Sequence, residues 1–167
     1  MVSLRRVEPP LRLSWFARSY SRMAATRPAK WVSRHLNWKL DPWLLRVTGG
    51  RFASTLVFPT ALLETRGARS GQLRRNPVIY FHDGDRVTIV ASNAGDEHHP
   101  AWFHNLVADP EVVLGGEPMQ AVVVVDESEC ERLWALADRV FPAFGRYRAD
   151  ASRVHRTIPI VQLAPRP

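Results

Sequence analysis

The amino-acid sequence predicts an α+β fold, a split β-barrel of about six mostly antiparallel strands flanked by helices and preceded by an N-terminal helical extension. Short β-branched runs, separated by Gly, Asp and Pro, dominate the chain from about residue 56. Most of the turns between these runs are too short for a parallel crossover. Two helical patterns interrupt the strands, in the order β-β-β-α-β-β-α-β, which favours a small barrel with helices outside it over a βαβ sheet.

The charge divides the 167 residues into a basic, Trp-rich extension over 1–50 and a near-neutral domain over 51–167. The extension has ten Lys or Arg against two acidic residues, a net charge of +8, and four of the six tryptophans. The remaining 117 residues have a net charge of −1. A basic, aromatic segment of this kind predicts contact with a negatively charged surface, either anionic lipid or nucleic acid.

Within the extension, residues 11–25 have apolar side chains at helical spacing and predict an amphipathic helix. A second helical pattern covers 31–40, and Asp41 followed by Pro42 starts a short capped helix that ends before Gly49. The amphipathic helix either rests on a membrane or packs on the barrel with its arginines in solvent.

In the domain, the pattern changes to a period of two and then alternates with two helices. Strands are expected over 61–66, 75–82, 86–92, 111–114, 119–125 and 157–163. A helix is expected over 99–108 with Pro100 at its first position, and a second begins with a capping box formed by Asp126 and Glu129. Residues 119–125 are apolar apart from Gln120 and predict a central strand, whereas 141–147 are expected to form an irregular loop.

The cysteine and histidine content favours a reducing compartment and a protein without a metal. Cys130 is the single cysteine, so the chain has no internal disulfide, and its place on an apolar helix face predicts a packed thiol. His98, His99 and His104 lack the spacing that would place ligands on one helix face. Arginines interrupt every early apolar run, which argues against a signal peptide or a membrane span, and we expect a cytoplasmic protein.

Residues 65–77 form an arginine-rich segment that suits an anion. Four arginines occur within ten residues without one acidic side chain: Arg66, Arg69, Arg74 and Arg75. Gly67 and Gly71 let the backbone approach a ligand, and the hydroxyl of Ser70 can donate to a phosphate or carboxylate. The alternative is a solvated hairpin loop that binds nothing.

A second candidate segment combines the end of a strand with the start of a helix. The letters ASNAG at 91–95 are followed by HPAWFHNL at 99–106. With Pro100 at the helix start, the N–H groups of Ala101, Trp102 and Phe103 are free to bind a phosphate. Trp102 and Phe103 can equally belong to the core.

Taken together, four segments resemble the deazaflavin-dependent nitroreductases and quinone reductases, a split-barrel family. They are TRGARSGQLRRNPVIYF, DGDRVTIVASNAG, HPAWFHNLVADPEV and RTIPIV, and the resemblance extends over about residues 38–163. The resemblance implies coenzyme F-420, an 8-hydroxy-5-deazaflavin with a phosphate and an oligoglutamate tail. It also implies an oxidoreductase that transfers a hydride from the reduced cofactor to a quinone-like or other conjugated acceptor, an enone or a nitroaromatic.

The resemblance places the cofactor along three stretches of the chain. The phosphate and tail are expected near Ala68, Arg69, Ser70, Arg74 and Arg75. The ring is expected near Asn76, Pro77, Val78, Ile79, Val90, Ala91, Ser92 and Asn93. The helix start closes the site with Ala101, Trp102, Phe103, His104 and Asn105. Relatives commonly have Arg-Lys where this chain has Ala68-Arg69, so one cation is missing, and Arg75 is expected to replace it.

For the reaction, Ser92 and Tyr147 are the predicted catalytic residues. Ser92 is expected to hydrogen-bond to the acceptor oxygen and Tyr147 to donate a proton, although either can instead be structural. Phe141, Phe144 and Tyr147 are predicted to line the acceptor pocket. Relatives have tyrosines in this region, so the two phenylalanines favour a flat apolar acceptor such as a quinone.

Two other functions are compatible with the residues. The barrel could bind FMN or another flavin-like or tetrapyrrole ligand, or the chain could be a binding module whose basic N-terminus contacts nucleic acid. The interpretation we favour has a small-molecule acceptor, peripheral membrane contact through residues 1–50, no nucleic acid, and a monomer or weak oligomer.

Overall fold

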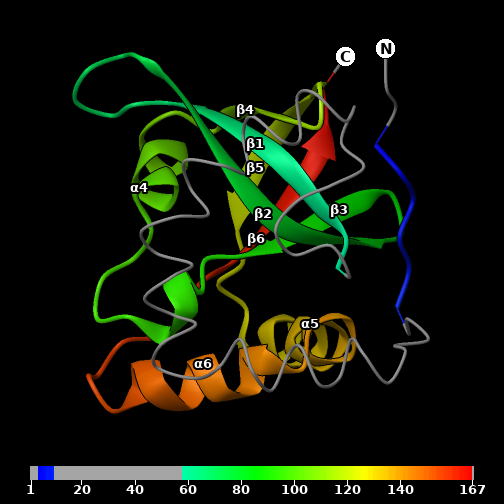
Figure 1. The fold of residues 1–167 in the computed structure, drawn as a ribbon. Coiled ribbons are helices and arrows are strands. Elements are labelled where there is room, and N and C mark those ends of the chain that lie inside the picture. The colour runs from blue at the N-terminus through cyan, green and yellow to red at the C-terminus, as the bar shows by residue number, and fades with distance from the viewer. Residues whose placement is uncertain (1–3, 10–57, 167) are drawn as a thin grey trace.

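The computed structural model describes residues 4–9 and 58–166, and the strands in this part of the chain close into an antiparallel barrel (Figure 1). The order around the barrel is β1-β2-β3-β6-β5-β4. The strands are β1 (Thr60–Arg66), β2 (Leu73–Asp83), β3 (Arg86–Val90), β4 (Glu111–Leu114), β5 (Glu117–Val123) and β6 (Ile160–Pro165). The predicted barrel of six antiparallel strands is confirmed, and closure pairs every one of them on both sides.

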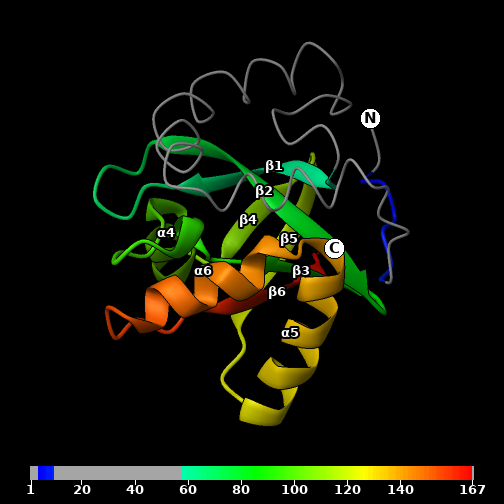
Figure 2. The same cartoon turned by 60° about the horizontal axis from the view of Figure 1, so that its bottom comes forward.

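Three α-helices in the described residues cover two different parts of the barrel. They are α4 (Ala101–Ala108), α5 (Glu127–Val140) and α6 (Ala143–Ser152), and a short 3₁₀ helix, η2 (Asn93–Gly95), precedes α4. In Figure 1, α5 and α6 lie together below the barrel and α4 lies at its side. In the turned view of Figure 2, which brings the bottom forward, α6 crosses in front of the strands. Within the described residues, no helix is both long and apolar enough to cross a membrane.

Of the two residues predicted to form a capping box at the start of α5, only Asp126 caps the helix. Asp126 accepts a hydrogen bond of 2.8 Å from the backbone N–H of Glu129, as an N-cap residue should. The carboxylate of Glu129 does not complete the box, because it binds the guanidinium of Arg132 instead.

The predicted loop over 141–147 is wrong, because α6 begins at Ala143. Pro142 is the N-cap residue, where a missing N–H costs nothing, so the proline starts the helix instead of breaking it. The buried face consists of Ala143, Phe144, Tyr147 and Ala151, which are spaced as a helix requires. Gly145 and the neighbouring charges obscured this face in the sequence.

Two strand predictions also need correction. The strand expected over 119–125 does lie between two partners, β4 and β6, but it is not buried on both faces, since Val122 is 54% exposed. It also ends at Val123, and Val125 is 90% exposed. The last strand starts at Ile160 and not at 157, after Pro159, which lacks the N–H that a strand pairing needs.

Alternation along the strands produces two separate hydrophobic cores. The barrel core consists of Val7, Ala61, Leu63, Val78, Tyr80, Val87, Ile89, Ala91, Trp102, Leu106, Val112, Leu114, Met119, Ala121, Val161 and Leu163. The helix-side core consists of Phe58, Phe81, Val90, Leu133, Ala137, Val140, Phe141, Ala143, Phe144, Tyr147, Ala151, Ile158 and Ile160. Neighbouring residues such as Tyr80 and Phe81 therefore belong to different cores.

Residues 4–9 run beside β2 and are fastened to the barrel. The backbone N–H of Val7 donates to Nδ1 of His82 at 3.0 Å, and the N–H of His82 donates to the carbonyl of Val7 at 2.6 Å. The hydroxyl of Tyr80 donates to the carbonyl of Arg5 at 2.9 Å. This part of the extension is not helical, whereas the helices predicted over 11–25, over 31–40 and after Asp41 lie outside the described residues.

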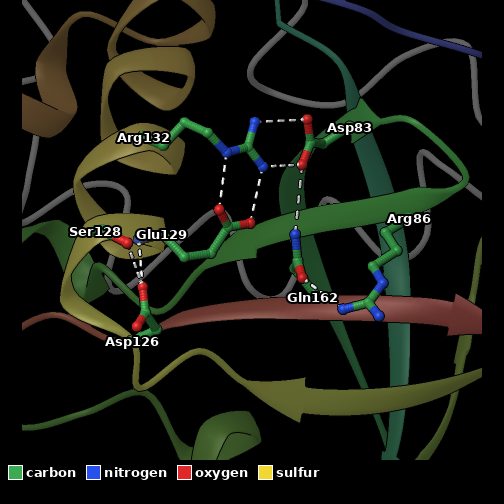
Figure 3. A network of polar contacts seen from close by, with 7 residues as sticks. All are labelled: Asp83, Arg86, Asp126, Ser128, Glu129, Arg132 and Gln162. Atoms are coloured by element: carbon green, nitrogen blue, oxygen red, sulfur yellow. Dashed lines mark hydrogen bonds and ion pairs between the residues drawn. The ribbon is translucent and has the colours of Figure 1, made fainter.

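A network of charged side chains joins α5 to the β2–β3 turn (Figure 3). The guanidinium of Arg132 binds both carboxylate oxygens of Asp83, at 3.0 and 2.5 Å, and those of Glu129 at 2.8 Å. Asp83 also accepts from Gln162 at 3.5 Å, and Gln162 accepts from Arg86 at 2.9 Å. The hydrogen bonds from Arg132 hold the pKa of Asp83 below its usual value.

We expect Arg132→Gln to lower the free energy of unfolding at pH 7 by about 1 kcal/mol, because the pairs are half-exposed and screened by solvent. The pKa of Asp83 is lower in the folded state, so its contribution is complete above about pH 4 and is lost as the pH falls through the folded-state value. Urea denaturation at pH 7 and pH 3 should show the difference between wild type and variant shrinking in acid. Arg139→Gln, an exposed arginine of the same helix, is the control, and an equal loss there would contradict the expectation.

Candidate functional site

The arginine-rich loop between β1 and β2 is a compact turn held by its own backbone. The N–H of Gly67 donates to the carbonyl of Gln72 at 2.9 Å, and the N–H of Gly71 donates to the carbonyl of Gly67 at 2.7 Å. Gly71 has a φ of +65°, which glycine adopts without strain. A Cβ on Gly67 would lie 2.8 Å from Oγ of Ser70 and 3.4 Å from the carbonyl oxygen of Gln72, so the hydroxyl of Ser70 would have to rotate away to admit it. The loop therefore presents its arginines from a defined backbone.

The four arginines of the loop differ in how far their charge is already compensated. Arg75 pairs with Glu64 at 3.2 Å, and Arg66 lies 3.9 Å from Asp109. Arg74 donates to the neutral amide of Gln72 at 3.1 Å. Among residues 4–9 and 58–166, no ion pair or hydrogen bond engages the side chain of Arg69. Arg69 and Arg74 are thus the cations that the described structure leaves available for an anion.

The loop is fastened to α4 by Asn105. The N–H of Ala68 donates to Oδ1 of Asn105 at 3.1 Å, and Nδ2 of Asn105 donates to Oγ1 of Thr65 at 3.1 Å. Thr65 is 1% exposed and Asn105 9% exposed, so this link is shielded from water. Ala68 and Asn105 are both predicted to bind the cofactor. In the structure they are brought together and hydrogen-bond to each other.

Strand β2 divides the other predicted contacts between two faces. Arg74, Asn76 and Val78 lie opposite Thr65, Leu63 and Ala61 of β1, on the face of the barrel core. Arg75, Pro77 and Ile79 lie on the outer face, where Ile79 packs against the helix-side core. A ligand outside the strand can contact only the side chains of Arg75, Pro77 and Ile79. Residues 74–79 therefore do not form the one continuous binding surface that the sequence predicts.

Several predicted contacts are core residues in this structure. Val78, Ala91 and Trp102 belong to the barrel core, and Phe103 packs against it. The side chains of these residues are therefore engaged in packing in or against that core. The interpretation of Trp102 as a core residue is confirmed.

The segment after β3 is backbone-strained. Asn93 and Ala94 have φ angles of +44° and +53°, and Gly95 follows with +77°. Left-handed geometry costs an alanine roughly 1 kcal/mol or more, so such a segment persists only when its surroundings hold it. Part of that support comes from α6, because Gly95 packs directly on the backbone of Tyr147.

The predicted acceptor residues are buried beside this segment. Phe141, Phe144 and Tyr147 pack on one another with ring centroids 5.0 to 6.4 Å apart. Val90 belongs to the same helix-side core, and Ile79 and Ala94 pack against it. The structure therefore brings two of the predicted ring residues, Ile79 and Val90, into one apolar region with the predicted acceptor residues. Of the acceptor residues, Phe144 and Tyr147 lie on α6 and not on a loop.

The start of α4 offers fewer free N–H groups than the sequence predicts. Pro100 is the N-cap residue and not the first helical residue, and the N–H of Phe103 donates to its carbonyl at 3.0 Å. Within the described residues, the N–H groups of Ala101 and Trp102 are left without a partner. A site for an anion remains here, but with two donors in place of three.

Sequence reasoning missed Arg156, whose side chain donates four hydrogen bonds to residues 91–99. Its guanidinium donates to the carbonyls of Ala91 at 2.5 Å, Ser92 at 3.1 Å and Asp96 at 2.5 Å. Its Nε donates to Nδ1 of His99 at 3.1 Å. Burial lowers the pKa of Arg156, and burial also lowers the pKa of His99, with help from the charge of Arg156. Arg156 is the first residue of the segment RTIPIV, and nothing local distinguishes it from a surface arginine.

An antiparallel six-stranded barrel, with an exposed arginine loop at one end of an apolar outer face, defines a split-barrel oxidoreductase that holds an anionic, flavin-like cofactor. The chain belongs to the F420H(2)-dependent quinone reductase family, whose model matches residues 38–165. It is therefore an oxidoreductase that uses coenzyme F-420, which decides between this cofactor and FMN.

Relatives and solved structures agree with this assignment. The chain is 33% identical over 148 residues to an F420H(2)-dependent quinone reductase of Mycobacterium tuberculosis strain H37Rv, covering 83% of this chain and 98% of the relative. A solved F420-H2 dependent reductase, FDR-A, is 31% identical with a TM-score of 0.55, over 63% of this chain and 93% of that one. A structure described as a domain-swapped dimer is 26% identical with a TM-score of 0.56, over 75% and 96%.

Gly95→Ala tests the contact between the strained segment and α6. A Cβ at Gly95 would lie 2.7 Å from the carbonyl oxygen of Tyr147, so we expect a loss of about 2 kcal/mol beyond the cost of the positive φ. Gly84→Ala is the matched control, because Gly84 has a φ of +60° and nothing within 4 Å. It should cost about 1 kcal/mol. Equal losses of unfolding free energy in the two variants would contradict the close packing.

Proposed function

We propose that the protein transfers a hydride from reduced coenzyme F-420 to a quinone, on the outer face of β2. The proposal rests on one observation about the helix-side core. Val90, Phe141, Phe144 and Tyr147 belong to this core, and Ile79 packs against it. The arginine loop lies at the other end of the same strand. A ligand with an apolar ring and an anionic tail matches this polarity.

The residues of the outer face fit the cofactor. Arg69 in the loop supplies a cation for the phosphate and the glutamates, and Arg75 on the outer face adds a cation that Glu64 partly neutralises. Arg74 lies on the opposite face of the strand and reaches such a ligand only from the loop end of β2. Pro77 and Ile79 are partly exposed apolar side chains that a flat ring can cover. Ala101 and Trp102 add two N–H donors at the start of α4.

When bound and reduced, the cofactor supplies the hydride, and the protein's residues position the acceptor and manage protons. A quinone takes up one hydride and one proton to become a hydroquinone. We assign the hydrogen bond to the acceptor oxygen to the half-buried hydroxyl of Ser92, and the proton to the phenol of Tyr147. The helix-side core keeps water away from this end of the site.

A quinone is favoured over a nitroaromatic because the wall of the helix-side core is apolar. Phe141 and Phe144 offer rings and no hydroxyl donors, which suits a flat acceptor whose oxygens need few partners. Apolar quinones reside in membranes. We propose that residues 1–50 bring the protein into peripheral contact with the lipid surface. That contact and the predicted monomer or weak oligomer stay predictions.

The acceptor is tested by following the absorbance of reduced F-420 with a panel of acceptors. We expect a short-tailed naphthoquinone to have a kcat/KM at least about tenfold above that of a nitroaromatic or an enone, because only the quinone is matched to the apolar wall. Binding of oxidised F-420, measured by fluorescence, is the control for a loaded site. Equal efficiency for all three acceptors, or oxidation of none, would argue against a quinone reductase.

The role of the arginine loop is tested by Arg69→Gln. We expect the Kd for F-420 to rise about tenfold, because one charge-assisted contact with the anionic tail is lost. The Kd for a deazaflavin riboside without phosphate and glutamates should not change. Arg153→Gln is the control, since Arg153 is an exposed arginine paired with Asp150 at 3.1 Å. The assignment fails if Arg69→Gln weakens both ligands equally or neither of them.

A further inference from the structure

We propose that Arg156 is a positioning residue that holds residues 91–99 in the conformation that receives the deazaflavin ring. The proposal rests on the proposed function, because it assumes that the ring lies against Ser92 and Asn93. It concerns a side chain whose four hydrogen bonds all go to residues 91–99 and not to the arginine loop or the predicted acceptor residues.

The fork of the guanidinium spans both ends of the segment. Where β3 ends, Nη2 donates to the carbonyl of Ala91 and Nη1 to the carbonyl of Ser92, and Nη1 also donates to the carbonyl of Asp96 beyond η2. A planar group with five N–H donors can reach these carbonyls at once, whereas the ammonium of a lysine cannot cover the same directions. Arg156 therefore fixes the distance between the two ends of the loop.

The fourth bond extends this support to α4. Nε of Arg156 donates to Nδ1 of His99, so the imidazole is neutral and its proton is on Nε2. The ring of His99 lies 5.0 Å from that of Phe103, in the first turn of α4. One side chain thus links the strand end and the helix start, which are the two predicted sides of the ring site.

The segment needs this support because its backbone is strained. Asn93, Ala94 and Gly95 are all left-handed, and two of them carry a side chain. Packing on α6 restrains Gly95 from one side, and Arg156 restrains the flanking carbonyls from the other. A strained backbone persists only where many surrounding contacts hold it in place. Such places are frequently ligand sites.

The burial of Arg156 is costly, which also points to a role beyond stability. The residue is 8% exposed, and its partners among the described residues are three carbonyls and a neutral imidazole, with no carboxylate. A buried cation without a counter-ion stabilises a fold poorly compared with an apolar side chain. The local fold nevertheless directs it inward, since α6 ends at Ser152, His155 is left-handed, and the N–H of Arg156 bonds to the carbonyl of Ala151.

The test compares Arg156→Lys, which keeps the charge, and Arg156→Met, which keeps the length, with Arg153→Met as control. The first readout is hydrogen exchange without any ligand, at the hydrogen-bonded amides of Ser92, Gly95 and Asp96. We expect both Arg156 variants to exchange at least about tenfold faster there, with no change at Gly67 and Gly71 in the arginine loop. The second readout is the Kd for the tail-less deazaflavin riboside, which should rise about tenfold in both variants and not in the control.

Each other outcome contradicts the proposal. If Arg156→Lys behaves as wild type and Arg156→Met does not, the charge matters and the fork does not. Faster exchange in both segments, or an unfolded lysine variant, would make Arg156 a support of the whole barrel. Failure of the wild-type protein to bind any deazaflavin would count against the proposed function, while the exchange readout would still decide the role of Arg156.

Discussion

Closure of the barrel is the constraint on which the rest of the structure depends. With β1 paired to β4, each strand has two neighbours, so side chains can only point inward or outward. Inward residues such as Val78 build the barrel core, and outward residues such as Ile79 meet α5 and α6 or a ligand. The same strand thus serves stability and function through alternate residues, and neither role disturbs the other.

The local parts of the fold were predictable because their signals are local. The Asp83-Gly84 turn, the strand over 111–114 and the cap at Asp126 follow from neighbouring residues, and all three are present. The family resemblance likewise identified the cofactor. What the sequence could not show depends on contacts between distant segments. Pro142 and Gly145 suggest a loop, and only packing in the helix-side core selects the apolar face of α6. Arg156 looks like any surface arginine in the sequence, and only the fold brings it to Ala91, which lies 65 positions earlier in the chain.

The candidate site combines features that reduce stability with features that offset the loss. Left-handed Asn93 and Ala94 and the buried charge of Arg156 are each unfavourable alone. The two features compensate for each other, because the guanidinium of Arg156 binds the carbonyls on either side of the strained residues. The resemblance, which rests on short motifs, predicted the cofactor stretches and did not single out Arg156.

The fastening of residues 4–9 on β2 has a consequence for any truncation of the chain. Val7 is anchored in the barrel core by His82. Removing residues 1–9 would therefore take an apolar side chain out of that core and three hydrogen bonds away from β2. A shortened chain would thus differ from the wild type in the stability of its barrel before any effect of the extension on binding could be measured.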